Sequence, residues 1–176
     1  RLAQQPQVGQ LALSEPPWRH SMQKEFTNQY TFEDLTVGDT YVIGRHQLER
    51  QEILDFGRQW DPMPFHIDED LANASHHGGL IASGTHMLAI RIKLLQSHGT
   101  NPYVIASMGY EEVKFLLPSR PGDEVTLHGE CVWKRESKSQ PDRGIAKFSF
   151  TLINQKDETV LSMVDTIFIL KSDALD

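Results

Sequence analysis

An aspartate and a histidine stand five residues apart, at Asp61 and His66, with prolines at positions 62 and 64 between them. Two prolines so close together predict a stiff, extended loop. A carboxylate and an imidazole on such a loop can direct polar atoms at one water molecule, which is the geometry of general acid–base catalysis. Structural roles stay open, because an Asp-Pro sequence often caps a turn and a buried histidine can simply be hydrogen bonded.

Other polar residues near this pair also have two interpretations. Ser83 either binds a substrate or satisfies the start of a helix. Asp68 suits the N-cap of a short helix that follows it. His76 and His77 invite a metal site together with His66 and Asp68. Adjacent histidines point in different directions and no spaced cysteine or third histidine completes a ligand set, so we predict no metal.

The hydrophobic pattern predicts the elements that carry these residues. A strand is expected over residues 41–49 and a short helix over 49–60, which places Ile53, Leu54, Phe56 and Trp60 near one face. Residues 81–96 predict a long helix that is apolar over more than one face, as expected when a sheet surrounds it.

The chain from residue 103 onward predicts strands separated by turn-rich segments. The last strand is apolar on both faces and should therefore lie inside the sheet. This order of elements indicates an α+β class, with a curved antiparallel sheet around one buried helix. Periodicity alone leaves other α+β folds open.

Composition and charge exclude several classes of function. The chain has 176 residues and a net charge of −7, with no basic run, so we expect no nucleic-acid partner. No apolar stretch approaches the roughly 20 residues of a membrane span. Cys131 is the only cysteine, which excludes an intramolecular disulfide and fits a reducing, cytoplasmic location. Apolar residues at odd positions, including Val125, Leu127 and Trp133, indicate that Cys131 faces the core.

Residues 1–22 are rich in Gln and Pro and lack the apolar region of a secretion signal. Met22 is a plausible native start, which would make the preceding residues an addition translated upstream of it. The alternative is a natural extension that docks through Trp18. We predict that residues 1–22 lie outside the domain and that residues 23–176 form a single domain.

The stretch DPMPFHIDEDLANASHHGGLIASG resembles the MaoC-like acyl dehydratases and (R)-specific enoyl-CoA hydratases. Two flanking segments, FEDLTVGD and VKFLLPSRPGD, agree with the same family, and the resemblance covers about residues 32–170. One position departs from the pattern: Met63 stands where the family often carries Asn. The positions that match are Asp61, Pro64, His66, Asp68, Ala72, Ser83 and Gly84.

The resemblance implies a hot-dog fold, in which the curved sheet wraps the long helix. It also implies that Asp61 and His66 share an activated water and that the Gly84 N–H receives the thioester oxygen. The expected reaction is reversible addition of water to a trans-2-enoyl-CoA, giving an (R)-3-hydroxyacyl-CoA. This reaction requires no redox or metal cofactor, and coenzyme A is counted as part of the substrate. A homodimer or higher homo-oligomer, joined through sheet edges, is implied as well.

Two alternatives remain at this point. A hot-dog thioesterase usually has its carboxylate on or beside the long helix, whereas residues 81–96 contain no Asp or Glu. A non-catalytic acyl-CoA-binding protein is disfavoured by the intact Asp61 and His66 pair, and mildly favoured by Met63.

Overall fold

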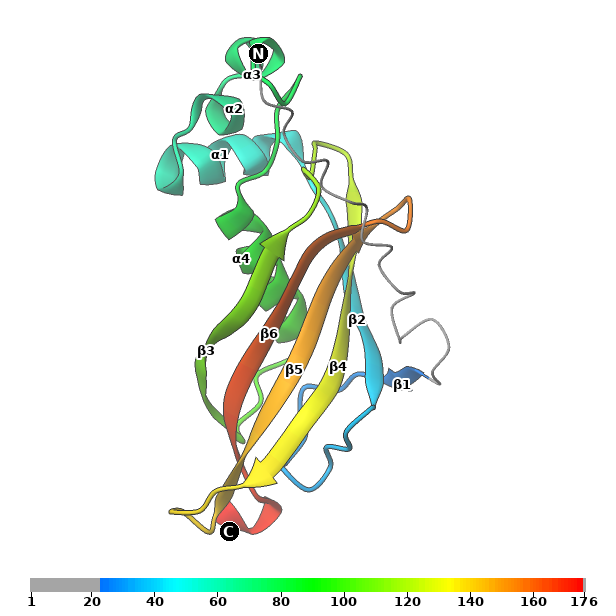
Figure 1. The fold of residues 1–176 in the computed structure, drawn as a ribbon, viewed down its shortest axis with the longest axis vertical. Coiled ribbons are helices and arrows are strands. Elements are labelled where there is room, and N and C mark those ends of the chain that lie inside the picture. Colours follow the sequence, from blue (N-terminus) through cyan, green and yellow to red (C-terminus); the bar gives the residue numbers. More distant parts are fainter. Residues whose placement is uncertain (1–22, 176) are drawn as a thin grey trace, which may run out of the picture.

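The computed structural model describes residues 23–175, so the expectations for residues 1–22 lie outside the described residues. A six-stranded sheet with the order β1-β2-β4-β5-β6-β3 forms the body of the molecule (Figure 1). Its strands are β1 (Gln23–Glu25), β2 (Thr40–Gln47), β3 (Val104–Phe115), β4 (Glu124–Glu136), β5 (Arg143–Asn154) and β6 (Thr159–Leu170). The helices are α1 (Arg50–Trp60), α2 (Pro64–Ile67), α3 (Glu69–Ala74), α4 (Gly84–Gln96) and the 3-10 turn η2 (Ser172–Leu175).

The sheet is antiparallel throughout, except that the short β1 pairs parallel with β2. Because β6 pairs with both β5 and β3, the strand predicted to lie inside the sheet does so. The strand β3 forms one edge, and nearly all of its residues are exposed. The α+β class and the hot-dog arrangement of a curved sheet along one long helix are confirmed.

One hydrophobic core joins α4 to the sheet. Met87, Ile90 and Leu94 of α4 belong to the same buried cluster as Leu127 of β4 and Leu152 of β5. The short helices α1, α2 and α3 gather at one end of the sheet, where α4 begins (Figure 1). This arrangement brings the segments around residues 61, 66 and 83 to the same end of the molecule.

The long helix is shorter than predicted. It begins at Gly84 rather than at residue 81, because Ser83 is its N-cap and has an extended backbone. Apolar residues lie on more than one face of the helix, as predicted, since Met87 and Ile90 are buried whereas Ile92 is exposed. The sheet therefore covers one side of α4 and leaves the other to solvent in the single chain.

Three smaller predictions were wrong. The extended loop ends one residue earlier than predicted, because Pro64 is the first residue of α2. Proline is tolerated at the first helical position, since an N–H there would have no acceptor within the helix. Trp60 is exposed at the end of α1. Trp133 is also exposed, since the register shifts between Cys131 and Trp133 and turns it away from the core. Cys131 itself is fully buried, as predicted, and burial raises the pKa of its thiol to about 11.

Between residues 23 and 175, no helix is long and apolar enough to cross a membrane.

Candidate active site

Asp61 is positioned by the end of α1. It is the C-cap residue, and its backbone N–H donates to the Gly57 carbonyl at 2.9 Å. Pro62 cannot continue the helix, so the chain turns directly after Asp61. The carboxylate is about one-third exposed, with a side-chain accessibility of 35%. It therefore combines a rigid backbone with access to solvent.

His66 is buried on α2, and only 6% of the residue is exposed. Its Nδ1 lies 2.7 Å from the carbonyl oxygen of Ile81. A carbonyl can only accept, so Nδ1 carries the proton and, in the neutral ring, Nε2 presents a lone pair. This Nε2 lies 3.5 Å from Asp61 Oδ2. The two predicted residues are thus brought together, with both polar ends directed at the same space.

Ser83 connects the start of α4 to Asp61. Its hydroxyl donates to Asp61 Oδ2 at 2.6 Å and accepts from the N–H of Thr85 at 3.3 Å. The Thr85 hydroxyl lies 2.8 Å away and must be the donor, because the one hydroxyl proton of Ser83 is already committed to Asp61. Ser83 therefore caps the helix and also orients the carboxylate. Its hydroxyl is engaged with protein groups rather than free to bind a substrate.

Gly84 is the first residue of α4. The first N–H groups of a helix have no acceptor within the helix, and the Gly84 N–H has none elsewhere among residues 23–175. A Cβ built on Gly84 would lie 2.8 to 3.0 Å from ring atoms of Phe115. The absence of a side chain lets the Phe115 ring approach this backbone, and a flat substrate group in place of the ring would have the same access.

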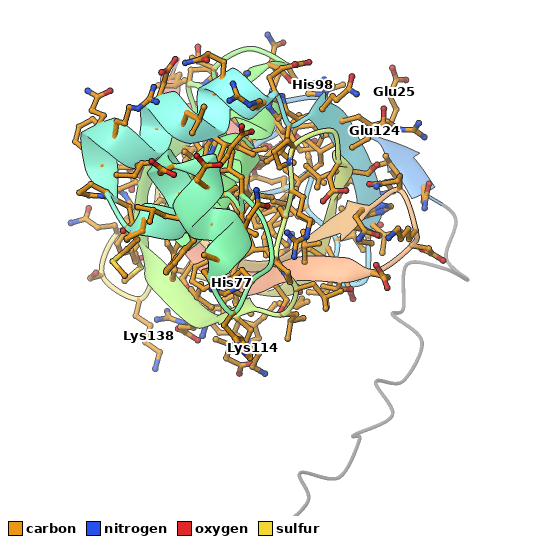
Figure 2. All side chains as sticks on the ribbon, turned by 90° about the horizontal axis from the view of Figure 1, so that it is seen from above. Glu25, His77, His98, Lys114, Glu124 and Lys138 are labelled. Atoms are coloured by element: carbon orange, nitrogen blue, oxygen red, sulfur yellow. The ribbon has the colours of Figure 1, made fainter. Side chains whose placement is uncertain are left out.

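A cavity of about 480 Å³ contains these groups. Its walls are largely apolar, as is usual for sites that bind organic molecules. Figure 2 shows the molecule from the end that carries the short helices, with His77 and Lys114 of β3 labelled on the same side. The cavity is lined by Asp61, Phe65, His66, His77, Ile81, Ala82, Ser83, Gly84, Thr85, Met87, Phe115, Leu116, Leu117, Pro118, Ser119 and Val160.

The arrangement is suited to moving a proton at a bound water. A water between Asp61 and His66 could donate one hydrogen to the carboxylate and the other to Nε2. Gly84 lines the same cavity at the positive end of a 13-residue helix, and an N–H without an acceptor at such a position suits a developing negative oxygen. Asp61, His66 and Gly84 thus all line one cavity.

Other residues singled out by the sequence lie outside this group. The Asp68 side chain accepts from the N–H of Leu71 and caps α3, as predicted. Met63 is 47% exposed and does not line the cavity. His76 is exposed, whereas His77 lines the cavity. Over the described part of the chain, no three His, Cys, Asp or Glu side chains are grouped as a metal ion would require.

Sequence reasoning missed Gly57, which holds α1 against α2. A Cβ at this position would lie 2.7 Å from the carbonyl oxygen of His66 and 3.0 Å from its Cβ. Glycine inside a helix costs about 1 kcal/mol relative to alanine. A mid-helix glycine is therefore a detectable signal of close packing, although the sequence does not say which residue it packs against.

Replacing Gly57 by alanine is expected to lower the rate of a reaction that depends on His66 about ten- to a hundredfold. The new methyl group would push the backbone of His66, and small displacements of a catalytic group are costly. Because the contact is with backbone, a change of rotamer cannot relieve it. Steady-state rates and thermal melting would be compared with Gln59→Ala, which is on the exposed part of the same helix. Unchanged turnover with a raised melting temperature would contradict this role of Gly57.

The chain is similar to known proteins in both sequence and structure. The chain matches the family model described as MaoC like domain over residues 25–151. The uncharacterized protein YdeM of Bacillus subtilis is 28% identical over 129 residues, which cover 73% of this chain and 90% of YdeM. The crystal structure of a MaoC-like dehydratase from Rhodospirillum rubrum is 36% identical with a TM-score of 0.74, covering 81% of this chain and 97% of that one.

An (R)-hydratase from A. caviae involved in PHA biosynthesis has the same fold. Its TM-score is 0.64 at 22% sequence identity, and the match covers 77% of this chain and 97% of the hydratase. At this identity the likeness concerns the fold alone.

Proposed function

The chain belongs to the MaoC-like domain family, and on that premise we propose that it is a hydro-lyase acting on acyl-CoA thioesters. The reaction is the reversible addition of water to a trans-2-enoyl-CoA, which gives an (R)-3-hydroxyacyl-CoA. The observation that carries the proposal is the approach of Asp61 and His66 to 3.5 Å, in a cavity that also contains the free Gly84 N–H.

The proposed mechanism follows from these contacts. Asp61, held by Ser83, takes a proton from water while His66 Nε2 accepts the second hydrogen bond. The water oxygen bonds to C3, and the electron pair of the C2–C3 double bond moves toward the thioester oxygen. The Gly84 N–H stabilises that oxygen. The proton then returns from the pair to C2, so H and OH are added across the double bond.

The proposed addition of water requires no redox or metal cofactor. Coenzyme A is part of the substrate. The lone cysteine, buried and reduced, fits a cytoplasmic location. We further propose a homodimer joined through β3. This edge strand exposes Ile105, Met108, Val113 and Phe115, and an unpaired edge with apolar side chains favours pairing with a second copy.

A screen of enoyl-CoA thioesters of several chain lengths tests the reaction. Loss of the conjugated enoyl absorbance would follow hydration, and the chirality of the product would be determined for the best substrate. Appearance of free coenzyme A thiol at the rate of substrate loss would instead support a thioesterase. Tight acyl-CoA binding without turnover of any substrate would support a binding protein.

A further inference from the structure

A carboxylate outside the reaction cavity joins three elements of the fold. Glu52, in the first turn of α1, has one oxygen, Oε1, within hydrogen-bond distance of two histidines. Nε2 of His46, on β2, lies 2.8 Å from this oxygen, and Nε2 of His86, on α4, lies 3.1 Å from it. None of these three residues lines the cavity that contains Asp61 and His66. The proposed reaction therefore leaves the group without a role.

His86 is buried and neutral. Only 5% of the residue is exposed, and burial, partly offset by Glu52, lowers the pKa of its imidazole. A carboxylate oxygen can only accept, so Nε2 of the neutral ring carries the proton and points at Glu52. Nδ1 then presents a lone pair, and it is buried without a hydrogen-bond partner among the described residues. A proton on Nδ1 would have no acceptor, so the ring is held in one tautomer.

The ring of His86 also stacks on α1. Its centroid lies 4.4 Å from that of Phe56, and the two ring planes are 8° apart. Glu52 and Phe56 are four residues apart on one face of α1, so His86 contacts two successive turns of that helix. Buried polar contacts specify one arrangement more strictly than apolar contacts do. His86 therefore fixes how α1 lies against the start of α4.

The other end of α1 carries the proposed general base. Asp61 is the C-cap of α1, and its Oδ2 accepts from the hydroxyl of Ser83 at 2.6 Å. Ser83 and His86 are three residues apart, which makes them neighbours at the start of α4. The helix α1 is thus attached to the first turn of α4 at two points, through Glu52 and through Asp61. These points are about 14 Å apart along the helix.

A groove between the two helices leaves room for α1 to shift. Its volume is about 490 Å³, and side chains of both helices line it. Trp60, near the end of α1, lines the groove and is 67% exposed. Because the described side chains do not fill this space, packing between the helices does not by itself fix their separation. The two attachments must therefore set where Asp61 lies.

We propose that Glu52 and His86 are positioning residues for the general base, because they hold α1 on α4 so that the carboxylate of Asp61 stays against Ser83. The assignment rests on the proposed function for the role of Asp61. Glu52 and His86 do not line the reaction cavity, so their loss should slow the chemical step and leave substrate binding unchanged. A catalytic group displaced by about 1 Å can lose about 100-fold in rate.

The kinetic test compares His86→Leu with His86→Gln. Leucine removes the donor and the ring, whereas the glutamine amide can still donate to Glu52. We expect His86→Leu to lower kcat for enoyl-CoA hydration about 10- to 100-fold with KM unchanged within about twofold, and His86→Gln to retain most of the rate. An unchanged kcat in His86→Leu would overturn the proposal, as would a rise in KM alone.

A second pair of variants changes the other partner. Glu52→Gln keeps an oxygen that accepts from both histidines, whereas Glu52→Leu removes it. Glu52→Leu should therefore lower kcat as His86→Leu does, and Glu52→Gln should not. The side chain of Glu52 is 28% exposed, so this pair gives the same comparison if His86→Leu does not fold. Equal rates for the two Glu52 variants would contradict the proposal.

Combination with Asp61→Asn separates positioning from a general loss of stability. If His86 acts through Asp61, then His86→Leu should lower the residual rate of Asp61→Asn little further. The control is Leu94→Val, which changes a buried side chain of α4 that packs against Gly44 of β2. It should lower the melting temperature and leave kcat unchanged. Losses that multiply in the double variant, or a kcat that falls equally in Leu94→Val, would attribute the effect to stability and refute the proposal.

Crystal structures of the unmutated chain and of the leucine variants test the geometry without turnover. The carboxylate of Asp61 should lie about 2.6 Å from Ser83 in the unmutated chain and beyond about 3.5 Å in the variants. A displaced Asp61 in a protein that hydrates no enoyl-CoA would contradict the proposed function and still support the attachment of α1. An unmoved Asp61 would overturn the positioning role, whatever the hydration rate.

Discussion

Asp61→Asn is expected to reduce hydration of enoyl-CoA by roughly 100- to 10,000-fold, the usual contribution of a positioned proton-transfer group. The amide keeps the size of the side chain and can still accept from Ser83, but it cannot take a proton from water. His66→Gln should have a comparable effect, because it removes the Nε2 lone pair. The double variant should be little worse than either single one, since both groups act on one water.

Asp68→Asn is the matched control for this experiment. It makes the same chemical change seven residues away, at the cap of α3 and outside the cavity lining. Asparagine is as good an N-cap as aspartate, so neither stability nor turnover should change appreciably. Binding of a saturated acyl-CoA should survive in Asp61→Asn and His66→Gln. Undiminished hydration in a folded Asp61→Asn protein would refute the role of the pair.

Gly84→Val is expected to lower hydration by about 100- to 1000-fold, which is the cost of losing one oxyanion donor in other enzymes. The valine side chain would occupy the approach to the Gly84 N–H and displace the ring of Phe115. That ring is half-exposed and can rotate away, so the fold should survive. The helix-propensity difference itself amounts to well under 1 kcal/mol.

Rates and melting temperatures of Gly84→Val would be measured beside Ala89→Val. This control introduces the same β-branched side chain on the exposed side of α4. It should lower stability slightly and leave turnover unchanged. A folded Gly84→Val protein with normal turnover would remove Gly84 from the site.

The sequence was most informative where a function depends on local spacing. Asp61 and His66 share one short segment, so their approach could be predicted from the chain alone. The cap at Asp68 and the burial of Cys131 are local as well. The link from Ser83 to Asp61 was not predicted, because it depends on where α4 begins and on how that start meets the end of α1.

Contacts between distant segments could not be predicted from the sequence. Arg91 and Asp165 are 74 residues apart, and only the packing of α4 against the sheet makes them partners. The same holds for Gly57 and His66, whose contact depends on the packing of two helices. The position of Trp133 could not be predicted from the alternation of apolar and polar residues along β4. One register shift between Cys131 and Trp133 reverses the face of the sheet on which the later residues lie.

We propose that Asp61 and His66 activate water for addition to a carbon–carbon double bond. The test is to incubate the unmutated protein with an enoyl-CoA in oxygen-18 water and to analyse the product by mass spectrometry. We expect an intact thioester that carries one heavy oxygen on its acyl chain at C3, and at least about 100-fold less label over the same time with Asp61→Asn. A free carboxylate bearing the heavy oxygen, with coenzyme A released, would contradict it.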